Sequence, residues 1–161
     1  MAQEVTTVRG TVAARIARYW GPVLMMIAAM YVFSTDFFSF ESTRAIVAAV
    51  LGWFMTDVSS TAIAEGNYVL RKSAHFAEYA VLAALVFRAF RADSMLRWRL
   101  IWGLYSLGVV VCWAVMDEYH QSQMRRRGGS VYDSLLDSAG GLFALVVIAL
   151  WSRRRSRSGA P

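Results

Sequence analysis

The sequence predicts an all-α fold, a polytopic membrane bundle of about four transmembrane helices with a short interfacial or re-entrant helix after the first span. The composition is one reason, since 57% of the 161 residues are hydrophobic and the mean hydropathy is +0.41. That is too apolar for an ordinary soluble domain. The second reason is the presence of four apolar runs that approach the roughly 20 residues needed to cross a bilayer. The third is charge placement, because the arginines lie in the connections between the runs.

The first apolar run, Tyr19 to Phe33, carries Pro22 near its start, where a helix tolerates proline. No small-x-small cleavage pattern follows this run, so we expect an uncleaved span, with a secretory signal as the alternative. The next run, Ala45 to Met55, has about a dozen residues and is too short to cross, which favours a helix lying near the headgroups. We expect the polar stretch Thr56 to Asn67 to form a loop.

The other three spans and the limits of the domain follow from the remaining apolar runs. The spans are expected from Arg71 or Lys72 to Phe87, from Leu100 to Met116 and from Ser134 to Trp151. Short connections between spans imply a compact antiparallel bundle. The chain then divides into a basic N-terminus (1–18), a single membrane domain (19–151) and a basic tail (152–161). Cys112 lies inside one apolar run and is expected to pack there.

The distribution of arginine predicts the orientation. If the short helix does not cross, both termini and the connection 88–99 share one side, with eleven of the 17 basic residues. The cytoplasmic side carries the excess of basic residues, so both termini should be cytoplasmic. The net charge of +6 is thus explained by topology, and we expect no nucleic-acid partner.

Two polar clusters beside apolar runs are the main functional signal. Lys72, His75 and Tyr79 are spaced i, i+3 and i+7 and share one side of the second span. Asp117, His120 and Gln121 repeat this arrangement at the end of the third span, and Ser130, Asp133 and Asp137 recur along the start of the fourth. Ionisable groups are expensive beside hydrocarbon, so three such stripes at one depth indicate a site.

These clusters carry a family resemblance. The pattern runs Arg71-Lys72-x-x-His75-Phe76-x-Glu78-Tyr79, then Asp117-Glu118-x-His120-Gln121, then Arg127-x-x-Ser130-x-x-Asp133-x-x-x-Asp137-x-x-Gly140. It resembles the VanZ-like family of small membrane proteins over roughly residues 20 to 150. The resemblance implies a role at the bacterial cell envelope and a place in the bacterial inner (cytoplasmic) membrane. The family takes its name from a protein linked to low-level teicoplanin resistance. It implies no agreed reaction. Where that family usually has a proline in the hairpin, this chain has Arg125.

The clusters admit two functional interpretations and a structural one. The first is binding of an anionic envelope lipid or glycopeptide-like ligand, since arginine suits phosphate. The ligand-binding candidates are Arg71, Lys72, His75, Tyr79, Gln121, Arg127, Ser130, Asp133 and Asp137. The second is a small membrane enzyme acting on a phospholipid or polyprenyl phosphate. The catalytic candidates are His75, Glu78, Asp117, Glu118 and His120.

On the structural interpretation the same groups pair with one another and fix the packing of the helices. The imidazoles and carboxylates are also suitable metal ligands. The spacing matches no dedicated zinc signature, so neither a metal nor another cofactor is expected. Membrane lipids are the expected partners, and the oligomeric state is left open.

Overall fold

The computed structural model describes residues 2–33, 40–55, 57–122 and 131–157. This part of the chain forms five helices and no strand. The helices are α1 (Ala2–Phe33), α2 (Phe40–Gly52), α3 (Ser60–Arg91), α4 (Leu100–Ser122) and α5 (Val131–Arg157). All but α2 are long and apolar enough to cross a membrane. At about 1.5 Å per residue, α2 extends only about 20 Å, less than a hydrocarbon core of about 30 Å. The predicted all-α class with four spans and one short helix is confirmed.

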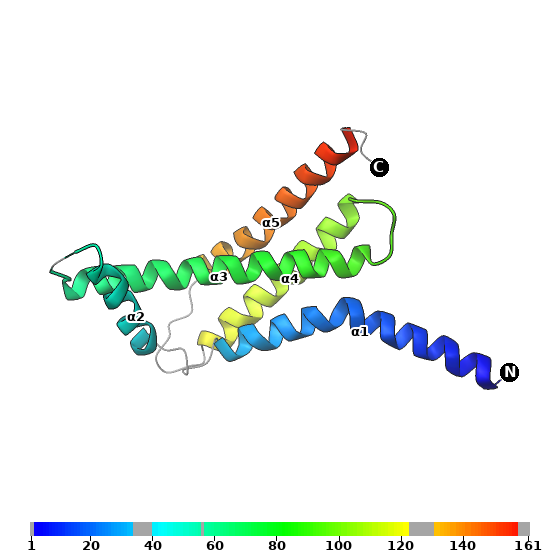
Figure 1. Ribbon diagram of the computed structural model, residues 1–161, viewed down its shortest axis with the longest axis horizontal. Helices are drawn as coiled ribbons and strands as arrows, with labels where there is room; N and C mark the ends of the chain where they lie inside the picture. The colour runs from blue at the N-terminus through cyan, green and yellow to red at the C-terminus, as the bar shows by residue number, and fades with distance from the viewer. Residues whose placement is uncertain (1, 34–39, 56, 123–130, 158–161) are drawn as a thin grey trace.

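Helix α3 is the central element, since it packs against each of the other four helices. The spans alternate in direction, and Figure 1 shows both chain termini at the same end as the connection between α3 and α4. The last turns of α1 and α4 and the first turn of α5 lie towards the opposite end. This is the relative placement that the arginine pattern requires. Which end faces the cytoplasm stays a prediction.

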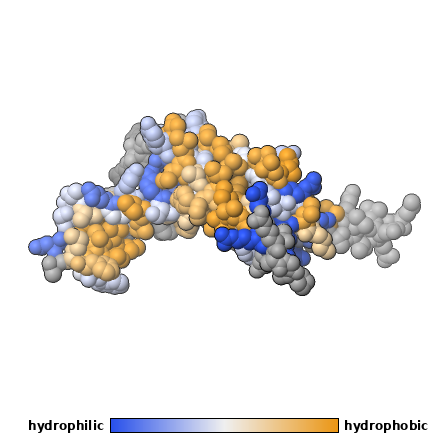
Figure 2. Space-filling view, turned by 90° about the horizontal axis from the view of Figure 1, so that it is seen from above, coloured by the Kyte–Doolittle hydropathy of each residue, from blue (hydrophilic) through white to orange (hydrophobic). Residues whose placement is uncertain are grey.

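The core is a narrow seam along α3. Tyr79, Leu82, Ala83 and Val86 are fully buried and recur at three- and four-residue spacing, against Val110 of α4. Large apolar side chains on the outer faces of all four spans are exposed. Figure 2 shows that they cover much of the visible surface over the helices, with hydrophilic side chains in separate patches. A small buried seam inside a broad apolar surface is expected of a protein that is solvated by lipid.

Two glycines of α5 let the helices approach closely. A Cβ on Gly140 would lie 2.3 Å from the backbone oxygen of Phe76 on α3. A Cβ on Gly141 would lie 2.6 Å from Cγ1 of Val110 on α4. The contact of α5 with both neighbours therefore depends on adjacent residues without side chains.

The predicted loop from Thr56 to Asn67 is wrong over most of its length, because α3 begins at Ser60 and not at Arg71 or Lys72. Ser59 caps the helix, its side chain accepting a bond from the amide of Ala62 at 3.1 Å. The early part of α3 is also covered by α2. The hydroxyl of Thr43 donates to the side-chain oxygen of Asn67 at 2.6 Å, and Asn67 is fully buried. This tertiary contact outweighs the polar composition on which the loop was predicted.

The other boundaries differ by a few residues from those expected. Helix α2 ends at Gly52, a poor helix former, so Trp53 to Met55 follow the helix. The third span continues to Ser122, so Asp117, His120 and Gln121 all belong to helix α4. Helix α5 begins at Val131, so Asp133 lies in its first turn. Cys112 is exposed on the outer face of α4 and not packed inside, because the helix turns it away from the seam.

Candidate functional site

Seven polar side chains from three helices meet close to one end of the bundle. We call them the polar layer: Lys72, His75 and Tyr79 of α3, Asp117 and Gln121 of α4, and Asp133 and Asp137 of α5. His75 is halfway along α3, whereas the other two helices contribute from their terminal turns. The first turns of α3 therefore extend beyond the ends of α4 and α5, as Figure 1 shows. The layer thus lies near the edge of the apolar bundle.

Polar contacts in the layer join α3 to each of the other two helices. The ammonium of Lys72 forms an ion pair with Asp133. His75 Nδ1 faces Asp137 Oδ1 at 3.9 Å. Asp117 Oδ2 accepts from the amide of Gln121 at 2.9 Å and, at a longer 3.5 Å, from the hydroxyl of Tyr79. The layer therefore ties α3 to both α4 and α5.

Three side chains of the polar layer are buried inside the bundle, and the other four are partly buried. Tyr79 is fully buried, and Asp137 and Asp117 retain only 4% and 8% exposure. A buried carboxylate is costly unless other groups compensate it. The surrounding donors and cations therefore stabilise the packing, and loss of one partner should cost more than loss of an exposed pair. This supports the structural interpretation for part of the cluster.

A cavity of about 190 Å³ lies beside the layer, between α3 and the adjoining ends of α1 and α2. Its lining consists of Phe33, Thr43, Arg71, Ala74, His75 and Glu78. Half of these side chains are ionisable. His75 belongs both to the cavity wall and to the polar layer, so the imidazole connects the two. The α3 cluster is thus divided, because Lys72 and Tyr79 face the layer while Arg71 and Glu78 face the cavity.

Several candidates do not join this arrangement. The ring of His120 lies against Tyr31 of α1, with centroids 5.2 Å apart, and not against the layer. Within the described part of the chain, its Nδ1 is buried without a hydrogen-bond partner. Glu118 is half-buried and does not line the cavity. Arg127 and Ser130 fall outside the described residues. Of the three cations predicted to bind an anion, Arg71 lines the cavity and Lys72 is paired with Asp133.

Sequence reasoning missed two walls of the cavity. Phe33 is the last residue of α1, and Thr43 belongs to α2. Thr43 is positioned by its bond to Asn67, a residue that was assigned to a loop. The signal available in the sequence was Asn67 itself, an amide about one helical turn before Arg71 in a stretch that is compatible with a helix. It gave no indication of the partner, because α2 docks through tertiary contacts.

Three residues of the layer are able to hold a divalent cation. One ligand atom from each of His75, Asp117 and Asp137 lies within 4.8 Å of the other two. Ligands of a tetrahedral zinc ion bound at about 2.1 Å are roughly 3.4 Å apart, so an ion would draw the 3.9 Å His75–Asp137 pair inwards. The donor types suit zinc or manganese. The sequence has no dedicated zinc signature, but the fold brings one imidazole and two carboxylates from three helices together.

Comparison with known proteins gives one family and no individual relative. No curated protein and no solved structure matches the chain. The model of the VanZ/LLP1 family matches residues 20–152, a range that contains the whole polar layer and the cavity lining. Together with the four apolar spans, this match establishes that the chain is a membrane protein of the VanZ/LLP1 family.

Proposed function

We propose that this protein binds an anionic group of a cell-envelope ligand, a lipid headgroup or a glycopeptide-like molecule, in the cavity formed by α1, α2 and α3. The observation that carries the proposal is the composition of the cavity wall. Arg71, His75 and Glu78 lie together around a space of about 190 Å³. Ion-pairing groups gathered at an empty space beside a membrane are characteristic of a ligand site.

The chemistry of the wall favours a phosphate or carboxylate. The guanidinium of Arg71 offers paired donors to such a group. His75 and Glu78 offer groups that accept or donate a proton. The apolar part of the wall, Phe33 and Ala74, suits the carbon chain next to the anionic group.

The polar layer supports this function by holding one wall in place. His75 faces Asp137 at 3.9 Å, and Asp137 stands on the helix that meets α3 most closely, at Gly140. Movement of His75 is therefore limited by two helices. A fixed wall lowers the cost of ordering the site on binding. The polar layer and the cavity are therefore two parts of one proposed site.

Binding is tested with the full chain purified in detergent, stripped of lipid and titrated with short-chain phosphatidylglycerol and phosphatidylcholine under native mass spectrometry. The variant Arg71→Gln should bind phosphatidylglycerol about tenfold more weakly, the loss expected for one charge-assisted hydrogen bond. A soluble glycopeptide added as competitor distinguishes the two ligand classes.

The matched control is Arg44→Gln. Arg44 is an exposed arginine of α2, beside Thr43, and does not line the cavity. It removes the same charge at the same end of the molecule. Equal losses in the two variants would show only general attraction of anionic lipid to positive charge and would refute a specific site at Arg71.

One observation favours a second candidate, a membrane enzyme acting on a phospholipid or polyprenyl phosphate. His75 Nδ1 lies 3.9 Å from Asp137 Oδ1, which is longer than a hydrogen bond, and closer approach would let the carboxylate orient an imidazole that works as a general base. On this alternative the His75 ring would transfer the proton, and Asp137 would position it. Conservative substitution of His75 by Asn with unchanged ligand affinity but no turnover of a bound polyprenyl phosphate would favour the enzyme.

A role in teicoplanin resistance is a separate expectation, implied by the family. Expression of the protein in a susceptible host should raise survival on teicoplanin, and Arg71→Gln should remove the gain while Arg44→Gln retains it. No gain in survival with the unaltered chain would reject a role in resistance. Ligand binding is tested independently by the titration.

A further inference from the structure

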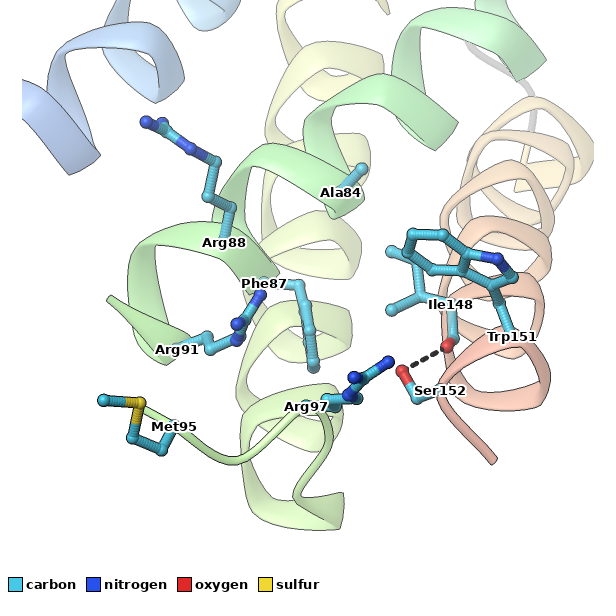
Figure 3. A pocket seen from close by; sticks show the side chains of 9 residues that line it. All are labelled: Ala84, Phe87, Arg88, Arg91, Met95, Arg97, Ile148, Trp151 and Ser152. Atoms are coloured by element: carbon cyan, nitrogen blue, oxygen red, sulfur yellow. Dashed lines mark hydrogen bonds between the residues drawn. The ribbon is translucent and has the colours of Figure 1, made fainter. Parts of the chain in front are cut away.

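A second and larger cavity lies at the other end of the bundle, about 510 Å³ in volume, within the range of small-molecule sites. It is bounded by the last turns of α3, the connection to α4 and the last turns of α5. Figure 3 shows this space opening between α3 and α5. The polar layer is remote from it, at the opposite ends of α4 and α5.

Arginines form one side of this cavity. In Figure 3 the guanidinium groups of Arg91 and Arg97 lie at the space between α3 and α5, whereas Arg88 is directed towards α1. Arg88 donates to the backbone oxygen of Arg18 at 3.3 Å and lies over the ring of Tyr19. Nε of Arg91 donates to the backbone oxygen of Leu96 at 3.0 Å, which fixes the connection and leaves its terminal nitrogens for other partners.

The positive charge of the cavity is not neutralised by the nearest acid. Asp93 is the only acidic residue of the connection 88–99, and it is engaged on the side of α1. Arg15 contacts it at 2.8 Å through Nε, and the hydroxyl of Tyr19 donates to it. Its pKa is lowered, first by the Tyr19 bond and then by Arg15, so the pairing persists at neutral pH. Among the described residues Arg97 makes no ion pair or side-chain hydrogen bond.

The opposite part of the lining is apolar. Ala84 and Ile148 line the cavity towards the middle of the bundle, and Trp151 borders it on α5 (Figure 3). Phe87 is fixed by stacking on Trp98, with centroids 4.9 Å apart. Cations at the end of the spans and apolar side chains towards their middle match the two parts of a lipid. Basic pockets between spans are typical sites for phosphate-bearing headgroups.

We propose that this cavity, which we call the arginine pocket, binds an anionic glycerophospholipid, with its phosphate at Arg91 and Arg97 and an acyl chain along Ala84 and Ile148. The pocket is separate from the cavity at Arg71 and lies in the opposite leaflet. It would fix the α3–α4 connection to the C-terminal end of α5 through a lipid. A soluble phosphate compound shares the headgroup chemistry but lacks the chain.

The test uses the full chain in detergent, stripped of lipid and titrated under native mass spectrometry with dioctanoyl phosphatidylglycerol, dioctanoyl phosphatidylcholine and glycerol 3-phosphate. Arg97→Gln is the main variant, since no described contact within the protein depends on that side chain. The control is Arg153→Gln, an exposed arginine next to the lining residue Ser152 that does not line the pocket itself. We expect Arg97→Gln to weaken phosphatidylglycerol binding about tenfold, as for one charge-assisted hydrogen bond.

Three results would overturn the proposal. They are equal affinity for the two lipids, equal effects of Arg97→Gln and Arg153→Gln, and binding of glycerol 3-phosphate as tight as that of phosphatidylglycerol, which would assign the pocket to a soluble anion. Loss of one bound phosphatidylglycerol in Arg97→Gln, but not in Arg153→Gln, supports it. Since Arg71→Gln should leave this lipid bound, failure here and failure at the first cavity are distinguishable.

Discussion

The close crossing of α5 over α3 gives the sharpest test of the packing on which the site depends. In Gly140→Ala the new Cβ would lie 2.3 Å from the carbonyl oxygen of Phe76, about an ångström inside ordinary van der Waals contact. A backbone carbonyl cannot rotate away as a side chain does, so the helices must separate. Phe76 follows His75 directly, and separation would also lengthen the 3.9 Å approach of His75 to Asp137.

The expected cost follows from two opposing effects. Overpacking costs about 1 to 3 kcal/mol, and a clash with backbone falls at the upper end. Replacing glycine by alanine inside a helix contributes about 1 kcal/mol in the other direction. Gly140→Ala should therefore lose about 2 kcal/mol of unfolding free energy, or roughly 4 to 8 °C in Tm for a chain of this size.

The assay is thermal unfolding of the purified protein in one detergent, followed by tryptophan fluorescence. Gly108→Ala is the matched control, because a Cβ there meets nothing within 4 Å and should leave stability unchanged or slightly higher. Gly141→Ala should fall between them, since Val110 is a side chain that can adjust. If Gly140→Ala and Gly108→Ala unfold at the same temperature, the crossing is not as close as described.

Three further predictions concern other contacts. Thr43→Val removes the donor to buried Asn67 and should loosen α2 by about 1 kcal/mol, seen as faster amide exchange in α2 with α4 unchanged; unchanged exchange in α2 would contradict the docking contact. The pKa of Asp93 is lowered from its ordinary value of 3.8, so its pairing stabilises the fold above that value and is lost as the pH falls further; Asp93→Asn should reduce this acid sensitivity, and an identical pH profile would refute the pairing. Cys112 is exposed on the outer face of α4, so Cys112→Leu should leave Tm unchanged, whereas a clear fall in Tm would place the side chain inside the bundle.

The sequence was sufficient to predict the fold class and to predict which polar residues share one face of α3. Spacing alone placed Lys72, His75 and Tyr79 on one side of α3, and the structure brings all three to partners on α4 or α5. It worked because a helix has a fixed period and because buried polar groups require partners.

The partners themselves could not be predicted from helical spacing. His120 shares the face expected from Asp117, yet its ring lies against Tyr31 of α1, since the rotation of α4 relative to each neighbour is set by packing. The polar neighbours of Asn67 in the sequence predict a loop, whereas in the structure Asn67 is on a helix and is covered by α2. The arginines of the connection 88–99 were interpreted through topology alone, and their arrangement around a cavity depends on where α5 ends.

Arg71 is proposed to hold a phosphate-bearing or other anionic envelope ligand in the cavity between α1, α2 and α3. The most direct measurement is mass spectrometry of the lipids that copurify with the unaltered chain and with Arg71→Gln, Arg44→Gln and Arg97→Gln. We expect Arg71→Gln to lose the anionic lipid of this cavity and to retain that of the arginine pocket, Arg97→Gln to show the reverse, and Arg44→Gln to retain both. Retention of the same lipids in the same amounts by Arg71→Gln would contradict the proposed role of Arg71.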